Sequence, residues 1–262
     1  MLRFYGSTWT QTFLPDSSPR ALVIHADGSG EYRSVETERA NEMGEWWTSN
    51  GFAYRVFDKY GCGESEGKWR HVTMDLLADQ IVALVEDSAK ESNLKIILVG
   101  HSEGSKLGFE VAARVEVAAL VARVPSHQEI RDRMKYQLLD MSKNVGLWEK
   151  WSRGITMAMA SKEKPDGFLA DYPLSYWVSC LGRTQPGDLV RKIKAPIFVL
   201  NGGADPFTPE LAYKPLHHAI AQRKIHGRSQ AKVYAEVGHS LLKPGCSWKE
   251  SEPAADILAW LQ

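Results

Sequence analysis

Short apolar runs that alternate with longer helical patterns are the feature that most limits how this chain can fold. The run KIILVG at 95–100 has no polar alternation, which is typical of a strand that is covered on both faces. Further strand-like runs lie at 21–26, 52–58, 117–124, 195–202 and 231–238. Segments with helical patterns lie at 36–50, 74–90, 104–115, 210–223 and 253–261. This alternation predicts an α/β fold with a mainly parallel sheet and helices on both faces.

One long interval interrupts this rhythm. Residues 125–191 contain no clear strand and instead have helical stretches rich in tryptophan, methionine and charge. We interpret 125–191 as an inserted helical cap, which leaves 1–124 and 192–262 as the core domain. Because active sites in such sheets lie at the carboxyl ends of the strands, an insertion at this position is expected to lie above the active site.

The pentapeptide GHSEG, at residues 100–104, is the strongest chemical signal in the chain. It fits the pattern G-x-S-x-G, follows a predicted strand and opens a predicted helix, as the nucleophile elbow requires. In that sharp turn a Cβ atom at Gly100 or Gly104 would clash. A serine there also lies at a helix N-terminus, which favours developing negative charge. We therefore predict that Ser102 is a nucleophile; the alternative is a tight turn with a capping serine.

A serine nucleophile needs a base and an acid that orients the base. In this type of fold the two follow the serine in the order acid, then histidine, each after a late strand. Asp205 follows the predicted strand 195–202, and His239 follows the last strand. The alternatives are an Asx-turn role for Asp205 before Pro206 and a structural hydrogen bond for His239. The order and the positions favour a triad of Ser102, Asp205 and His239.

Five motifs together resemble the α/β-hydrolase family: VIHADGSGEYR, FDKYGCGESEG, LVGHSEG, LNGGADPFTP and VGHS. They are most similar to those of bacterial serine esterases and dienelactone-hydrolase-like acyl hydrolases. The resemblance implies an α/β-hydrolase fold and ester or thioester hydrolysis without a cofactor. It also implies an oxyanion hole in which the backbone N–H of Glu103 is one donor. The second donor is Ser29 if Asp27-Gly28 replaces the usual His-Gly, or Gly28 if the register is shifted.

The chain departs from the family pattern at Asp27, at Tyr60 and in its short opening segment. Asp27 stands where the family has histidine, and Tyr60 stands where arginine is usual. Asp58 is expected to anchor its loop rather than act as a second catalytic acid. His101, next to the nucleophile, is expected to point to the opposite side of the turn and serve packing. Only about 20 residues precede 21–26, so we expect the opening antiparallel strands to be shortened or partly missing.

Composition excludes several classes of function. The 32 lysines and arginines equal the 32 aspartates and glutamates, which indicates neither a nucleic acid nor an anionic membrane as a partner. The basic run at 131–135, RDRMK, is interpreted as a solvated helix face. No apolar run approaches a membrane span, no signal peptide is seen, and three cysteines without a CxxC pair fit a reducing compartment, so we expect a cytoplasmic protein. No metal-ligand spacing is present.

These observations together predict a serine carboxylesterase-like hydrolase that acts on small to medium neutral esters. Trp148, Trp151 and Trp177 of the cap are predicted to line the substrate pocket, with packing of the cap as the alternative. Other chemistry on the same triad stays open, namely a thioesterase, peptidase, lactonase or carbon–carbon hydrolase. A silent ligand-binding member of the fold stays open too. The sequence does not indicate the oligomeric state.

Overall fold

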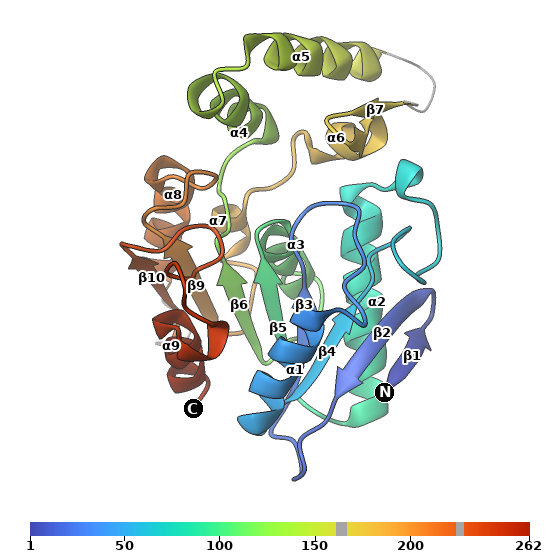
Figure 1. The fold of residues 1–262 in the computed structure, drawn as a ribbon, viewed down its shortest axis with the longest axis vertical. Helices are drawn as coiled ribbons and strands as arrows, with labels where there is room; N and C mark the ends of the chain where they lie inside the picture. Colours follow the sequence, from blue (N-terminus) through green and yellow to red (C-terminus); the bar gives the residue numbers. More distant parts are fainter. Residues whose placement is uncertain (161–166, 224–227) are drawn as a thin grey trace.

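An eight-stranded sheet forms the centre of the computed structural model, which describes residues 1–160, 167–223 and 228–262 (Figure 1). The strand order is β1-β2-β4-β3-β5-β6-β9-β10, and all neighbours from β4 to β10 run parallel. The parallel strands are β3 (Leu22–Ala26), β4 (Ala53–Phe57), β5 (Ile96–His101), β6 (Ala119–Arg123), β9 (Ile197–Gly202) and β10 (Gln230–Tyr234). The predicted fold is therefore confirmed.

Helices cover both faces of the sheet. On one face lie α1 (Glu38–Ser49) and α9 (Glu252–Leu261), and on the other lie α2 (Met74–Ser92), α3 (Glu103–Ala112) and α8 (Glu210–Ala221). Successive residues of one strand enter different cores: Leu98 packs with α2 and α3, whereas Val99 packs with α1 and α9. This arrangement explains why the central strands have no polar alternation.

Two antiparallel strands open the sheet. These are β1 (Leu2–Tyr5), which pairs with β2 (Thr8–Phe13), and β2 in turn pairs with β4. Gly6, at φ 57°, provides the left-handed residue in the turn between them. Of the two alternatives expected, shortened or partly missing strands, the structure has the first: both strands are present and short, and the tight turn fits them into few residues.

The chain between β6 and β9 contains α4 (Ile130–Lys135), a π-helical turn (Tyr136–Met141), α5 (Val145–Ala160), β7 (Phe168–Leu169), β8 (Tyr172–Pro173), α6 (Leu174–Cys180) and α7 (Pro186–Leu189). Figure 1 shows α4, α5 and α6 beyond the carboxyl ends of the strands. By contrast, α7 packs against α3 and α8 of the core domain. We call α4 to α6 the cap; the boundaries 125–191 stay a prediction.

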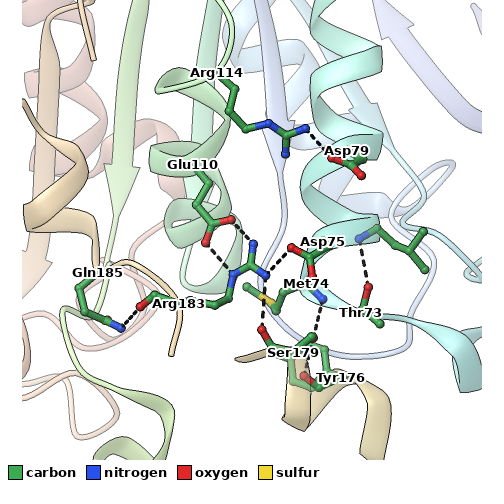
Figure 2. Close-up of polar contacts among 11 residues, drawn as sticks. Thr73, Met74, Asp75, Asp79, Glu110, Arg114, Tyr176, Ser179, Arg183 and Gln185 are labelled. Atoms are coloured by element: carbon green, nitrogen blue, oxygen red, sulfur yellow. Dashed lines mark hydrogen bonds and ion pairs between the residues drawn. The ribbon is translucent and has the colours of Figure 1, made fainter. Parts of the chain in front are cut away.

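The C-terminal end of the cap is fastened to two core helices. Figure 2 shows the Arg183 guanidinium between Glu110 of α3 and Asp75 of α2. Its Nε lies 2.9 Å from Glu110 Oε1 and its Nη1 lies 2.8 Å from Asp75 Oδ1, and Nη2 contacts the second Glu110 oxygen. The backbone N–H of Met74 also donates to Ser179 Oγ at 2.8 Å. These contacts fix α6 relative to the sheet end.

Candidate active site

Ser102 occupies a strained turn between β5 and α3. Its φ of 54° and ψ of −112° lie in a region that non-glycine residues rarely adopt. A Cβ atom at Gly100 would lie 2.5 Å from Ser105 Cα, and one at Gly104 would lie 2.0 Å from the Ala26 carbonyl oxygen. Both glycines are therefore required by close backbone approach, and the context predicted for a nucleophile elbow is present.

Asp205 and His239 are hydrogen-bonded to each other. The distance from His239 Nδ1 to Asp205 Oδ2 is 2.7 Å. The other carboxylate oxygen, Oδ1, accepts from the backbone N–H groups of Phe207 at 2.8 Å and Thr208 at 3.2 Å. The Asx-turn role and the orienting role thus coexist, one on each oxygen. The turn after β9 fixes the carboxylate, and the carboxylate fixes the imidazole.

Asp58 behaves differently from Asp205. Its Oδ1 accepts from the backbone N–H groups of Ser34 and Val35 at 2.7 and 2.9 Å, and its Oδ2 accepts from that of Glu64 at 3.2 Å. The side chain is fully buried. Three backbone donors on one carboxylate are the geometry of a loop anchor, as predicted.

One cavity of about 450 Å³ brings four of the predicted site residues together. Its lining residues are Gly28, Ser29, Tyr32, Arg39, His101, Ser102, Arg133, Gln137, Phe207, Thr208 and His239. The two predicted oxyanion-loop residues thus share the cavity with Ser102 and His239. Asp205 lies behind His239 and is buried.

His101 does not point away from the site. Its ring centroid lies 5.2 Å from that of His239, and it lines the same cavity. Because the chain turns so sharply directly after β5, the last side chain of the strand reaches the same sheet end as the nucleophile. Burial, with a further contribution from the charge of Arg123, lowers the pKa of His101 well below its ordinary value. A neutral imidazole therefore lies beside His239.

A buried lysine holds the loop that follows β3. Lys59 Nζ donates to the Gly28 carbonyl at 2.7 Å, and Tyr32 Oη donates to the same oxygen at 2.9 Å. Lys59 is only 3% exposed, and its Nζ lies 3.7 Å from Glu103 Oε1. The Glu103 carboxylate also accepts from the hydroxyl of Tyr176 in α6. One network thus joins the β3 loop, the first residue of α3 and the cap.

The three predicted pocket tryptophans lie elsewhere. Trp148 stacks on Trp151 at 5.7 Å between ring centroids, and Trp177 meets Trp151 edge-on at 5.6 Å. Trp151 and Trp177 are buried. None of the three is among the described residues that line the cavity with Ser102. Because these aromatic rings contact one another and are not among the lining residues, the structure favours the alternative, packing within the cap.

Sequence reasoning missed several cavity residues. Arg133 lies in the run that was interpreted as a solvated helix face, yet its side chain lines the cavity, so that interpretation is wrong for this residue. Gln137, one helical turn further, lines it too, and this spacing was the signal available in the sequence. Lys59 is not among the described lining residues but holds the Gly28 carbonyl, and it had no signal because it occupies a variable position of the loop motif.

No group of three or more histidine, cysteine, aspartate or glutamate side chains within 1–160, 167–223 and 228–262 is arranged to hold a metal ion. In the same part of the chain, no helix combines the length and apolar character needed to cross a membrane.

Two protein families match parts of this chain. Residues 17–163 match the family described as serine aminopeptidase S33, and residues 153–262 match the dienelactone hydrolase family. Esterase EstD of Thermotoga maritima is 22% identical over 236 residues, which cover 86% of this chain and 56% of that protein. The chain therefore spans little more than half the length of this curated relative.

Solved structures of proteins with different activities share the fold. A monoacylglycerol lipase of Paleococcus ferrophilus has a TM-score of 0.65 at 20% identity, with 97% of this chain and 98% of that chain covered. A proline iminopeptidase of Mycobacterium smegmatis has a TM-score of 0.60 at 17% identity, with 100% and 97% covered. The match to residues 17–163 extends over more than half of the sequence, and we conclude that the chain belongs to the serine aminopeptidase S33 family and has the α/β-hydrolase fold.

Proposed function

We propose that the protein is a serine carboxylesterase-like hydrolase that cleaves small to medium carboxylic esters through an acyl-enzyme on Ser102. The observation that carries the proposal is the strained elbow serine, which shares one cavity with a histidine bonded to a fixed carboxylate. The similarity of the chain to an esterase and to a monoacylglycerol lipase supports it. The cavity of about 450 Å³ suits a substrate of modest size.

The proposed chemistry follows from the orientation of His239. Its Nδ1 is engaged by Asp205, which leaves Nε2 to accept the proton of Ser102 Oγ. Oγ then bonds to the ester carbon, and the proton passes from Nε2 to the leaving alkoxide as the carbon–oxygen bond breaks. Water repeats the sequence on the acyl-enzyme, releases the acid and restores the serine.

The oxyanion is proposed to bind the backbone N–H groups of Glu103 and Ser29. Glu103 is the first residue of α3, and the N–H groups of a first turn have no acceptor within their helix. Two donors hold the Gly28 carbonyl. Since C=O and N–H of a trans peptide point in opposite directions, the N–H of Ser29 is directed away from Lys59. This supports Ser29 over Gly28 as the second donor.

An aminopeptidase is the competing activity, because the family description and one structural neighbour carry that name. An aminopeptidase has to bind a substrate ammonium group, which needs a carboxylate or an equivalent acceptor in the cavity. The described lining residues include two arginines and no aspartate or glutamate. A positively charged lining repels an ammonium group, and this favours the ester.

The cytoplasm is the proposed location. All three cysteines, Cys62, Cys180 and Cys246, are free thiols. Free thiols persist in reducing compartments.

The decisive experiment is labelling with a fluorophosphonate probe, combined with turnover of p-nitrophenyl esters. The wild type is expected to bind one probe on Ser102. Ser102→Ala should lose the label and reduce kcat by about 10³-fold or more. Ser105→Ala is the matched control, because its hydroxyl donates to the Arg123 carbonyl and it should keep the label. Undiminished turnover in Ser102→Ala would falsify the proposal.

A further inference from the structure

The cavity that contains Ser102 has an excess of positive charge. Among its described lining residues are two guanidinium groups, those of Arg39 and Arg133, and no carboxylate. Asp27 Oδ1 lies 3.6 Å from Arg39 Nη2 and partly balances that charge. Within the described part of the chain, no acidic side chain lies within ion-pair distance of Arg133. The uncompensated charge therefore belongs to Arg133.

The Arg133 guanidinium contains a nitrogen whose hydrogen-bonding capacity is not satisfied. The residue is partly buried on α4, and its Nε is shielded from solvent with no hydrogen-bond partner in the described part of the chain. A second cation lies nearby: burial first, then repulsion from Arg133, lowers the pKa of Lys106 to about 8. A guanidinium nitrogen that is shielded from water and has no hydrogen-bond partner is unfavourable. Such an arrangement is completed when an anion binds.

Arg133 and Gln137 of the cap share the cavity with Ser102 and His239 of the core domain. Gln137 lies one helical turn beyond Arg133 and lines the same cavity, so both side chains leave the cap on one side. Ser102 directly follows β5, and His239 lies in the loop after β10. A substrate bound between them would place its ester at the serine and another polar group at the cap.

We propose that Arg133, assisted by Gln137 and Arg39, binds a carboxylate of the substrate, so that the protein prefers esters that carry this group. A carboxylate matches the planar fork of a guanidinium, which can donate two parallel hydrogen bonds to it. This inference rests on the proposed ester hydrolysis and replaces the expectation of a neutral substrate. It places the selection of substrate charge on α4 rather than on the tryptophans.

The test compares esters that differ only in the anionic group. On the acyl side, p-nitrophenyl hydrogen succinate is paired with its neutral isostere p-nitrophenyl isocaproate. On the alcohol side, p-acetoxybenzoate is paired with p-acetoxybenzamide. In the wild type, kcat/KM is expected to be about tenfold or more higher for the carboxylate in at least one pair, as one charge-assisted bond supplies.

The ratio within each pair is the readout, because it is insensitive to a uniform loss of activity. Arg133→Met should reduce the ratio to near one, and Arg133→Lys should retain part of it. Arg131→Met is the matched control, because Arg131 lies on the same helix, is exposed and does not line the cavity. It should leave the ratio unchanged.

Two outcomes overturn the inference in distinguishable ways. If neutral esters are hydrolysed and Ser102 labels, but no pair favours the carboxylate or the preference survives in Arg133→Met, the esterase stands and the carboxylate site is wrong. If the wild type hydrolyses no ester and Ser102 does not label, the proposed function is wrong and the inference falls with it.

Discussion

The floor of the cavity and the cap above it are held by different kinds of interaction. On the floor, backbone groups fix the functional side chains: a strained turn presents Ser102, and two backbone N–H groups hold Asp205. In the cap, side chains hold side chains, as in the tryptophan stack around Trp151 and the clamp of Arg183. The proposed chemistry thus lies on residues that backbone groups hold, and the proposed selection of substrate charge lies in the cap.

The largest expected effect tests the floor. Asp205→Asn should lower kcat by about 10⁴-fold, because the amide cannot hold His239 in the tautomer that accepts the serine proton. Its remaining oxygen can still accept from the backbone of Phe207, so the midpoint of thermal unfolding should change little.

Asp58→Asn is the opposite case and serves as the control. It should leave kcat near the wild-type value but lower the free energy of unfolding by about 1–3 kcal/mol, because one amide oxygen cannot serve three backbone donors. A normal rate in Asp205→Asn would mean that another group orients His239.

The difference between the floor and the cap explains which site residues could be predicted from the sequence. An elbow needs glycine at two positions because carbonyl and Cα atoms approach within 2.0–2.5 Å of where a Cβ would lie. The sequence GHSEG therefore indicates this turn directly. Asp205 and His239 could be located because each follows a strand, and strand ends meet at one edge of a parallel sheet. Positions with such backbone constraints require particular residue types, and these can be recognised in a single sequence.

The cap carries no such signal. An apolar helix position does not show whether it faces a substrate or another helix, and for this reason the sequence could not decide between a pocket role and cap packing for Trp148, Trp151 and Trp177. Lys59 was missed because its contact with Gly28 joins two loops that are distant in sequence. Long-range side-chain contacts of this kind need the tertiary structure.

The next largest effect tests the ion pairs by which Arg183 joins the end of the cap to the core domain. Arg183→Met leaves the partly buried Glu110 without its partner and is expected to cost roughly 2–4 kcal/mol of unfolding free energy. Arg114→Met removes the exposed pair with Asp79 that Figure 2 also shows, and should cost no more than about 1 kcal/mol. Equal losses in urea titrations of the two variants would show that the clamp contributes no more than a surface pair.

A smaller effect is expected where the floor and the cap meet, at Lys59. Lys59→Met removes a donor from the Gly28 carbonyl and should lower kcat about 10–100-fold with a smaller change in KM, because the proposed oxyanion donor at Ser29 would be misplaced for the transition state. Lys59→Arg should restore part of the rate. Tyr176→Phe frees the Glu103 carboxylate from the cap and should have a weaker effect of the same kind. A change in KM alone would assign Lys59 to substrate binding.

The smallest expected effect separates cavity lining from cap packing. Phe207 lines the cavity, is 45% exposed, and lies 5.4 Å from His239 between ring centroids. Phe207→Ala should therefore shift the preferred acyl length in a series of p-nitrophenyl esters, by about 1 kcal/mol between neighbouring lengths, since a methylene in an apolar pocket contributes little more. Trp148→Ala removes a larger ring that does not line the cavity, so the profile should keep its shape even if the protein is less stable. A shifted profile in Trp148→Ala, with Phe207→Ala unchanged, would return the tryptophans to the substrate pocket and would place acyl selection in the cap rather than beside the histidine.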